Sequence, residues 1–392
     1  MSTSNKTILF LSFYFTPDLC AGSFRNSTLL DMIESQSFEK LNKVVITTKP
    51  NRYKDFRMQS KAYERRGSVE IYRIQIPDHQ SGIIDQIRAF VIYFYKGFRI
   101  AYKYKPALVY ASTSRLFTGF LGALCSRLGT SPLYLDVRDI FLDTIMDIYK
   151  RSVVRYLLYP VVSLFEKFTM QSARHINLIS SGFENYFYAR YPDKKYSNFS
   201  NGVDALFLTD KYYTKTDSST DNLIVYAGNI GEGQGLHILL PGLAKYLPEY
   251  QIVIIGDGGA KQRLLDGIQG LPNVQLMQPM PRDNILEYYQ KASYTLIHLN
   301  NNKAFKKVLP SKVFELAAIN KPILAGVDGY ASQFLAENVE DCLLFKPGDY
   351  NEAAKLIHSH QYRAIDRDLF KIRYSRRNIN RRMAKSILSY AR

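Results

Sequence analysis

The chain has 392 residues, of which 46% are hydrophobic and 14% aromatic, enough for two or three globular domains with well-filled cores. Its three cysteines, Cys20, Cys125 and Cys342, lie far apart, which argues against a disulfide framework or a zinc site and favours a reducing, cytoplasmic compartment. The formal net charge of +17 calls for an acidic partner, and nucleic acid and an anionic membrane surface are the two candidate classes.

Apolar runs separated by longer helical or loop stretches fill the first half of the chain. We predict strands at residues 8–13, 43–48, 69–74, 107–111, 133–136, 176–179 and 196–199. This alternation predicts a parallel, doubly wound α/β sheet. Because residues 8–15 have only Lys6 as a basic flank, we interpret them as a strand and not as a signal peptide. The longest apolar run, residues 156–165, is half a membrane span, so we do not expect the chain to cross a bilayer.

Two amphipathic helices are predicted in this half, at residues 84–104 and 151–170. The second begins with Arg151 and Arg155 and contains Pro160, and the tail, residues 361–392, adds ten Lys or Arg against two Asp. For each helix taken alone, the alternative interpretation is that the apolar stripe packs against the protein core and the basic residues face solvent. The three together favour an anionic membrane over nucleic acid, for which the sequence has no zinc-finger or RNP-like pattern. The first helix has an apolar stripe of Ile84, Ile87, Val91, Phe94, Phe98 and Ala101, flanked by Arg88, Lys96, Arg99 and Lys103.

A polar stretch at residues 211–220 marks the predicted domain boundary. After it, a second alternating series predicts strands at residues 223–227, 251–255, 274–277, 294–298 and 323–325. We therefore predict an N-terminal domain of residues 1–208, a C-terminal domain of residues 209–360 and a basic tail of residues 361–392. Two such domains with a cleft between them would bind ligands at the carboxyl ends of their strands.

Glycine-rich turns follow two of the predicted strands in the second half. Residues 228–235 and 256–259 contain several glycines, which let backbone N–H groups approach a phosphate or a sugar. Neither turn matches a P-loop, and a glycine turn alone is a weak signal. Residues 17–25 follow the first strand of the chain and carry Gly22 and Arg25, which could face the same cleft from the other side.

The segment of residues 310–318 has the groups that bind a nucleotide. Pro310 and Ser311 open a predicted helix whose N–H groups suit a diphosphate, and Lys312 adds a positive charge. Glu315 lies one turn further on, where its carboxylate could bind a ribose diol. An ordinary capped helix with a surface Lys and Glu is the alternative for this segment taken alone.

Seven short motifs follow one another along the chain, at residues 17–25, 179–183, 201–204, 226–229, 256–258, 273–274 and 310–315. Their order resembles that of the retaining GT-B glycosyltransferases of family 4. Among these the sequence is most similar to the branch with N-acetylfucosamine transferases of bacterial O-antigen and capsule assembly. The resemblance covers about residues 8–360. It implies two Rossmann-like domains facing a cleft, a nucleotide sugar bound mainly by the C-terminal domain, and a C-terminal helix that crosses back to the N-terminal domain.

The resemblance also implies roles for single residues. Glu315 matches the second glutamate of the E-x7-E motif of the family, which binds the ribose hydroxyls, whereas Lys307 replaces the first. The Arg and Lys that clamp the diphosphate in the family correspond to Asn229 and Gln234. We expect Lys312 to supply the missing charge. The expected donor-binding residues are Gly22, Arg25, Gly228, Asn229, Gly256, Asp257, Ser311, Lys312 and Glu315.

Asp139 and Lys312 are the expected catalytic residues. Asp139 ends a strand where the family presents acceptor-side or catalytic groups, and a helix cap is the alternative for it. The implied reaction displaces a nucleoside diphosphate from an anomeric carbon with retention, and fixed donors stabilise the leaving group without a metal or another cofactor. Of the histidines, only His298, at the end of a predicted strand, is singled out.

Three functions stay open at this point. The first is a glycosyltransferase at the inner face of the cytoplasmic membrane that moves a hexosyl or N-acetylhexosaminyl group from a nucleotide sugar to a lipid-diphosphate-linked glycan. UDP as the nucleotide is an expectation from the resemblance. The second is a nucleotide-sugar epimerase of the GT-B fold. The third is a non-catalytic binding or scaffold protein, because the usual Glu, Arg and Lys are missing.

Overall fold

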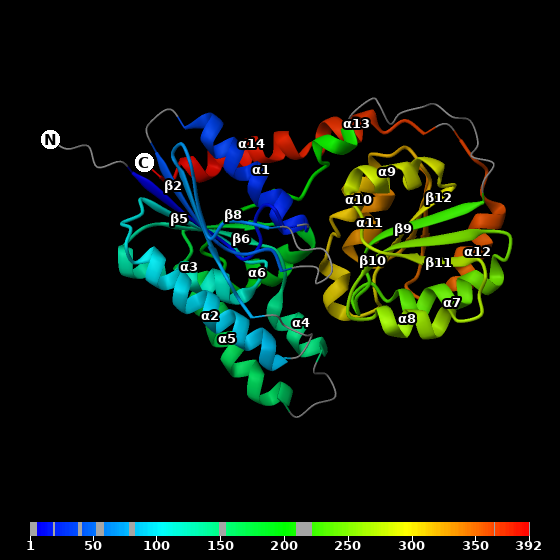
Figure 1. The fold of residues 1–392 in the computed structure, drawn as a ribbon, viewed down its shortest axis with the longest axis horizontal. Helices are drawn as coiled ribbons and strands as arrows, with labels where there is room; N and C mark the ends of the chain where they lie inside the picture. Colours follow the sequence, from blue (N-terminus) through cyan, green and yellow to red (C-terminus); the bar gives the residue numbers. More distant parts are fainter. Residues whose placement is uncertain are drawn as a thin grey trace. The chain divides into compact units, whose positions relative to one another are not determined.

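The computed structural model describes residues 6–18, 20–37, 41–51, 59–77, 83–148, 154–208, 222–363 and 365–391. The chain forms two compact units, each with its own sheet and core (Figure 1). Unit 1 comprises Met1–Asn201 and Arg377–Arg392, and unit 2 comprises Gly202–Arg376. The predicted polar connector, residues 211–220, lies outside the described residues.

Unit 1 contains, within the described residues, one sheet of eight strands in the order β3-β4-β2-β1-β5-β6-β7-β8. All neighbours are parallel except β3 and β4, which form an antiparallel hairpin. The central strand β1 is buried along its whole length, as expected for a parallel sheet with helices on both faces. The strands are β1 (Thr7–Ser12), β2 (Asn42–Thr48), β3 (Tyr63–Arg66), β4 (Val69–Ile74), β5 (Leu108–Ser112), β6 (Leu133–Val137), β7 (His175–Leu178) and β8 (Lys195–Ser197).

Helices cover both faces of this sheet. On one face, α3 packs between α2 and α5 (Figure 1). On the other, α1 and α14 share a core with the strands, built from Leu29 and Ile33 of α1 and Met383 and Ile387 of α14. The helices are α1 (Ala21–Gln36), α2 (Ile83–Ala101), α3 (Leu116–Gly129), α4 (Phe141–Ile148), α5 (Val154–Ser172), α6 (Glu184–Arg190) and α14 (Arg376–Leu388).

Unit 2 contains, in its described part, a fully parallel sheet in the order β11-β10-β9-β12-β13-β14. Its two apolar cores lie against the helices that connect the strands. The strands are β9 (Leu223–Asn229), β10 (Gln251–Asp257), β11 (Val274–Met277), β12 (Tyr294–His298), β13 (Ile323–Gly326) and β14 (Cys342–Phe345). The helices are α7 (Leu236–Tyr246), α8 (Lys261–Ile268), α9 (Arg282–Lys291), α10 (Lys312–Ala317), α11 (Tyr330–Asn338), α12 (Tyr350–Ser359) and α13 (Asp368–Arg373).

The units divide at positions that differ from the predicted boundaries. The chain enters unit 2 at Gly202, before residue 208, because the N–H of Val203 donates to the carbonyl of Tyr374 at 2.7 Å. It leaves unit 2 after Arg376 and not at residue 360, because Arg367 is buried there and donates to the carbonyls of Lys321 at 3.0 Å and Glu340 at 3.1 Å. Backbone pairing and a buried guanidinium therefore keep both segments in unit 2.

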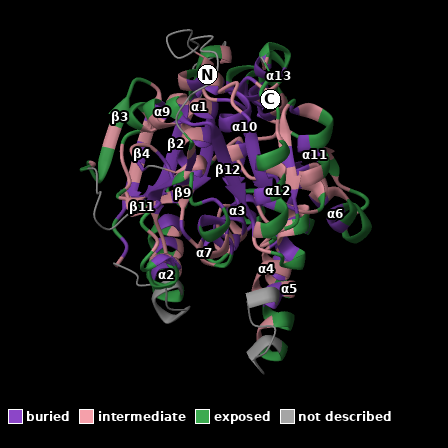
Figure 2. Cartoon of the chain, turned by 90° about the vertical axis from the view of Figure 1, so that its right-hand side faces the viewer, coloured by how far each residue is buried: buried purple, intermediate pink, exposed green. Residues whose placement is uncertain are grey.

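The exposed face of α2 carries part of the apolar stripe that the sequence predicts. Ala89, Tyr93 and Gly97 face the interior, and α3 packs closely against Gly97, since a Cβ there would lie only 3.1 Å from Leu121. Ile87 and Val91 of the predicted stripe are instead 51% and 60% exposed, and α5 likewise exposes apolar residues (Figure 2).

Among the described residues, none of the helices is both long and apolar enough to span a bilayer.

Candidate active site

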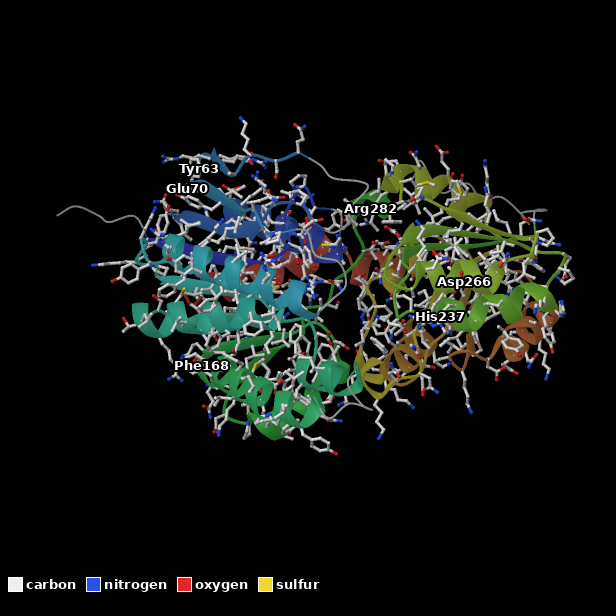
Figure 3. All side chains as sticks on the ribbon, turned by 60° about the horizontal axis from the view of Figure 1, so that its bottom comes forward. Tyr63, Glu70, Phe168, His237, Asp266 and Arg282 are labelled. Atoms are coloured by element: carbon white, nitrogen blue, oxygen red, sulfur yellow. The ribbon has the colours of Figure 1, made fainter. Side chains whose placement is uncertain are left out.

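A row of alternating charges within unit 2 joins Asp204 to side chains of α9 and α10 and to Arg376, the last residue of the unit. The Nζ of Lys312 lies 2.6 Å from Glu315 Oε2, and Nη2 of Arg282 lies 3.1 Å from Glu315 Oε1. The other end of Arg282 contacts Asp204 Oδ2 at 2.9 Å, and Arg376 contacts the same oxygen at 2.5 Å. Arg282 opens α9, where Figure 3 labels it. The row has three cations and two carboxylates, so its net charge favours an anionic ligand.

Glu315 is held in its ionised form by its neighbours. Its side chain is buried, with 7% of the residue exposed, and burial alone would raise its pKa. The charges of Lys312 and Arg282 outweigh burial, so the pKa of Glu315 is lowered. The pKa of Lys312 is raised in spite of burial, chiefly by Glu315 and then by Tyr289. A fixed, charged carboxylate with lone pairs to spare can accept hydrogen bonds from a diol.

The ends of β9 and β10 lie beside this row. Gly228 and Gly256 pair with each other in the sheet. A Cβ at Gly228 would lie 3.6 Å from Cε of Lys312 and 3.1 Å from the Tyr226 hydroxyl, so the backbone here approaches the lysine closely. A Cβ at Gly256 would collide with the Gly228 carbonyl, which makes that glycine a requirement of the sheet. The structure therefore brings together Gly228, Lys312 and Glu315 of the predicted donor site.

Asn229 and Gln234, at the positions of the family's Arg and Lys, bind each other. Nδ2 of Asn229 donates to Oε1 of Gln234 at 2.7 Å, and the Gly231 N–H donates to the same oxygen at 3.3 Å. This amide pair shapes the turn after β9. Asp257, at the end of β10, forms an ion pair with Lys261 at 3.4 Å, and its carbonyl accepts the Ile230 N–H at 2.9 Å.

The neutral imidazole of His298 holds the turn after β9 in place. Its Nδ1–H donates to the Gln234 carbonyl at 2.5 Å, and its Nε2 accepts the Gly348 N–H at 2.9 Å. Burial lowers the pKa of His298 to about 4, so the imidazole is uncharged at neutral pH. His298, at the end of β12, therefore has a structural role, because its two hydrogen bonds connect this strand to the loops that contain Gln234 and Gly348.

The start of α10 offers less to an anion than the sequence predicts. The helix has six residues, and Ser311 precedes it with helical backbone angles. The N–H groups of Val313 and Phe314 already donate to the carbonyls of Pro310 and Ser311, at 3.1 and 3.2 Å. The positive charge at this end comes from the side chain of Lys312 and not from a row of open N–H groups.

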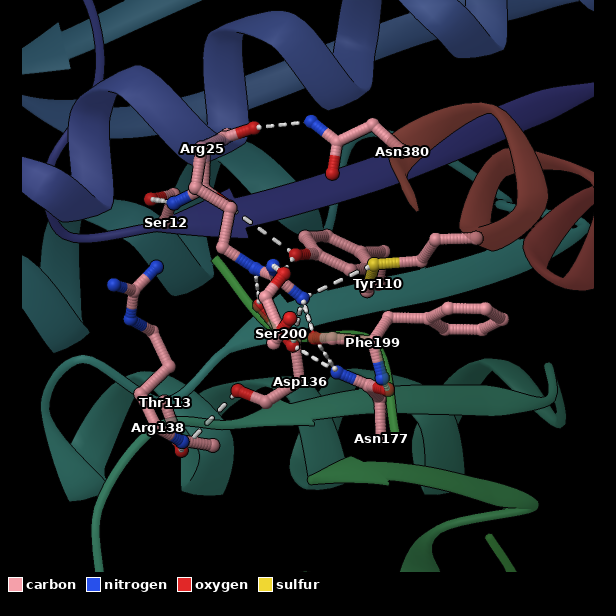
Figure 4. Close-up of polar contacts among 12 residues, drawn as sticks. Ser12, Arg25, Tyr110, Thr113, Asp136, Arg138, Asn177, Phe199, Ser200 and Asn380 are labelled. Atoms are coloured by element: carbon pink, nitrogen blue, oxygen red, sulfur yellow. Dashed lines mark hydrogen bonds and ion pairs between the residues drawn. The ribbon is translucent and has the colours of Figure 1, made fainter. Parts of the chain in front are cut away.

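Arg25 is placed differently from the prediction. It is fully buried in unit 1 and forms two bonds with Asp136, Nε to Oδ2 at 2.9 Å and Nη2 to Oδ1 at 3.0 Å (Figure 4). Its guanidinium also donates to the carbonyls of Ser200 at 2.5 Å and Phe199 at 2.8 Å. We therefore remove Arg25 from the donor-binding set, because its donors serve the interior of the unit. Gly22 lies in the first turn of α1.

Asp139 lies two residues before α4 and contacts the start of this helix. Its Oδ1 accepts the Ile140 N–H at 2.8 Å and the Thr144 hydroxyl at 3.2 Å, just before and within α4. Burial raises the pKa of Asp139 to about 6 in spite of these bonds. Its side chain thus bonds to the residue before α4 and to a hydroxyl within it, and neither of these bonds goes to an N–H of the first turn; the catalytic role of Asp139 stays a prediction.

Sequence reasoning did not single out Arg282, Arg376 or the carboxylate of Asp204. Asp204 belongs to a motif of the resemblance, and Arg282 follows Pro281 at a helix start, but neither pattern indicates its partner. Lys307, at the position of the family's first glutamate, ends a short helical turn, Lys303–Lys307.

The described residues contain no group of three or more His, Cys, Asp or Glu side chains that could hold a metal ion. One Asp-x-Asp sequence occurs, Asp366-Arg367-Asp368, at the start of α13. Asp368 contacts Lys371 at 2.8 Å, and Asp366 accepts the N–H of Asp368 at 2.9 Å. These two carboxylates therefore serve the start of the helix.

Residues 211–360 match the family described as "Glycosyl transferases group 1". A search of curated proteins found no match. Among solved structures, the chain is similar to Anabaena Alr3699/HepE in complex with UDP and glucose, at 16% identity and a TM-score of 0.67, over 98% of this chain and 100% of that one. It is also similar to the apo form of the lipopolysaccharide outer core galactosyltransferase WaaB, at 13% identity and 0.59, over 98% and 99%.

A further similar structure is UDP-GlcNAc 2-epimerase from Neisseria meningitidis bound to UDP-GlcNAc, at 12% identity and a TM-score of 0.58, over 98% of this chain and 100% of that one. At these identities the likeness establishes the fold, which transferases and epimerases share. The match of residues 211–360 adds the family of the second half. The chain therefore has the GT-B fold, and its residues 211–360 match the group 1 glycosyl transferases.

Proposed function

We propose that the protein is a retaining glycosyltransferase of family 4, from the N-acetylfucosamine transferase-like branch, that uses a UDP-linked hexose or N-acetylhexosamine. Its acceptor is a lipid-diphosphate-linked glycan in bacterial surface polysaccharide assembly. The observation that carries the proposal is Glu315, held ionised between Lys312 and Arg282 beside the close backbone turn at Gly228. This arrangement lies within the group 1 glycosyl transferase match.

In the proposed reaction, Glu315 accepts hydrogen bonds from the ribose hydroxyls, and Lys312 lies near the diphosphate. The bond between the anomeric carbon and the diphosphate breaks, and its electron pair leaves with the nucleoside diphosphate. The acceptor hydroxyl attacks the same face of the sugar, and its proton passes to the departing phosphate. Lys312 stabilises the charge that develops on that phosphate, a role that needs no metal and no other cofactor.

The surface of unit 1 supports a peripheral location on the cytoplasmic face of a membrane. On α2 the exposed apolar residues Ile87 and Val91 accompany exposed Arg88, Lys96 and Arg99. Such a combination suits an interface with anionic lipids. Of the predicted basic residues, Arg151 and the side chain of Arg155 lie outside the described part of the chain. On α5 the exposed apolar residues are Tyr156, Leu157, Tyr159, Val161 and Leu164.

Charged substitutions on α5 are expected to weaken membrane binding. Leu157 and Leu164 are 71% and 68% exposed, so Glu at both sites should leave the fold intact while it removes apolar contact and adds repulsion. We expect at least roughly tenfold weaker cosedimentation with vesicles rich in phosphatidylglycerol. Ile238→Glu, at an exposed site on α7 of unit 2, is the control and should bind as the wild type does. Equal binding of all three proteins would contradict this location.

The activity is tested with a panel of UDP-, GDP- and dTDP-sugars and a lipid-diphosphate sugar in detergent. We expect a glycosylated lipid with one UDP-sugar, and equal turnover when a chelator is present. An epimerase would instead convert a UDP-sugar without any acceptor. A scaffold would give no product with any donor and, in calorimetry with nucleoside diphosphates, no binding heat. Either of these results would replace the proposal.

A further inference from the structure

The sheet of unit 1 has a topological switch point between β1 and β5. Strand β1 pairs with β2 on one side and with β5 on the other, and the chain leaves these strands into α1 and α3. In open α/β sheets, ligands bind outside the carboxyl ends of the strands at such a point. Ser12 and Ser112 end the two strands here, and the loop from Ser112 to Arg115 follows.

The first turn of α1 lies at this switch point and faces a guanidinium. The helix has 16 residues, so its end has N–H groups without helical partners and a full positive dipole. A Cβ at Gly22 would lie 3.7 Å from Cβ of Tyr14 and 3.9 Å from Cζ of Arg138. The absent side chain of Gly22 therefore leaves the guanidinium of Arg138 directly beside the helix end.

Arg138 has hydrogen-bonding capacity that the protein does not use. Its Nη1 exposes less than 1 Å² and has no hydrogen-bond partner among the described residues. Figure 4 shows the contrast with Arg25, whose guanidinium is joined to Asp136 and to two carbonyls. The loop that carries Arg138 is fixed, because its N–H donates to Thr113 Oγ1 at 3.2 Å. A buried N–H without a partner is costly, which points to a partner supplied by a ligand.

A second guanidinium, that of Arg115, contacts Tyr14. Nη2 of Arg115 donates to the Tyr14 hydroxyl at 3.0 Å, and its Cζ lies 5.4 Å from the ring centre of Phe90. Like Arg138, Arg115 has a buried nitrogen, Nε, for which the described residues provide no partner. Through its Cβ and its hydroxyl, Tyr14 thus joins the helix end, where Gly22 lies, to Arg115.

We propose that the N-terminal turn of α1, Arg138 and Arg115 form a binding subsite for a phosphate or diphosphate ester, and that this ester belongs to the lipid-linked acceptor. Guanidinium groups and a helix N-terminus are the two protein features best suited to a phosphate. The Asp136 carboxylate is hydrogen-bonded to Arg25, and its charge also acts on Arg138, so two arginines share one carboxylate and a net positive charge remains for the ester. The assignment to the acceptor rests on the glycosyl transfer proposed above. The diphosphate of the donor has the same chemistry, so the experiment must separate the two sources.

The test compares wild type with Arg138→Gln and Arg138→Lys in two binding titrations and one kinetic assay. A short prenyl diphosphate serves as the acceptor probe and UDP as the donor probe, each titrated alone by calorimetry. For Arg138→Gln we expect about ten- to a hundredfold weaker binding of prenyl diphosphate, UDP binding unchanged, and Arg138→Lys in between. With a lipid-diphosphate sugar, the acceptor KM should rise and the donor KM should not.

Arg174→Gln is the matched control, since this exposed arginine precedes β7, at the amino end of a strand of the same sheet, and its replacement loses the same charge. Thermal unfolding of each variant shows whether the fold is kept. Weaker UDP binding with unchanged prenyl diphosphate binding would overturn the assignment to the acceptor. Unchanged binding of both probes by folded Arg138→Gln would overturn the subsite. Because the titrations need no turnover, an absence of transfer activity refutes the proposed function without deciding the subsite.

Discussion

Replacement of Glu315 by alanine is expected to lower kcat/KM for the nucleotide sugar by roughly ten- to a hundredfold. The variant loses charged hydrogen bonds to the ribose that contribute about 1.5–3 kcal/mol. It also leaves Lys312 and Arg282 side by side without the carboxylate that now separates them at 2.6 and 3.1 Å. Their mutual repulsion should disturb the position of Lys312, so turnover falls together with donor affinity. Steady-state kinetics over a range of donor concentrations measure both quantities.

Two further variants sharpen this experiment. Glu337→Ala removes an exposed carboxylate of α11 in the same unit, which contacts Gln333 at 2.8 Å, and should leave the kinetics as in wild type. Glu315→Gln keeps the shape of the side chain but not its charge, so it should resemble Glu315→Ala if charge is what matters. A donor KM and turnover that stay unchanged in Glu315→Ala would refute the role of this residue.

The buried ion pair in unit 1 should give the largest effect on stability. Arg25 and Asp136 both have fully buried side chains, and Asp136 also accepts hydrogen bonds from Asn177 at 2.7 Å and Tyr110 at 3.1 Å. Asp136→Ala leaves the guanidinium buried without its counter-ion, which typically lowers the free energy of unfolding by about 3–5 kcal/mol. Denaturant unfolding followed by circular dichroism measures the loss. The double replacement of Arg25 and Asp136 by leucine leaves no buried charge and should be less destabilised than Asp136→Ala.

The contribution of the Arg25–Asp136 pair to the stability of the fold depends on pH. Burial would raise the pKa of Asp136, but the charge of Arg25 lowers it below the usual 3.8. The folded state thus binds fewer protons than the unfolded state below pH 3.8, and the contribution to stability is complete above that pH. It is lost as the pH falls through the lowered pKa of the folded state. Asp136→Ala should therefore show a smaller acid-induced loss of stability, and a loss equal to that of wild type would contradict this account.

Much of the fold follows from local patterns in the sequence, and the exceptions have physical causes. Continuous apolar runs such as Ile8–Leu11 predict the central strands because both faces of these strands are buried. Strand β3 was not predicted, because its four residues include three charged ones and it lies exposed at the edge as part of a hairpin. On α2 the buried face has Ala89 and Gly97 beside Tyr93, and Gly97 allows the close approach of α3, which a search for a stripe of large apolar residues does not detect.

The donor site could be predicted only as far as its contacts are local. Lys312 and Glu315 are three residues apart on one helix, so their pairing is visible in the sequence. Arg282 reaches Glu315 from a different helix, and nothing near either residue indicates this contact. Arg25 fails as a donor-site residue for the same reason, because its partner Asp136 is 111 positions away. Residue type and spacing therefore identify the charged side chains of a site, but not the distant residues with which these side chains form ion pairs.

The course of the chain through the two units has a consequence for biosynthesis. Gly202–Arg376 is continuous, so unit 2 can fold as soon as it has emerged from the ribosome. Unit 1 needs Arg377–Arg392 as well, because Met383 and Ile387 complete its core. At about 5–20 residues per second, synthesis of the intervening 175 residues takes about 10 to 35 seconds. During this interval the nascent N-terminal segment exposes an apolar surface that only the end of the chain can cover, which makes it a natural client for chaperones.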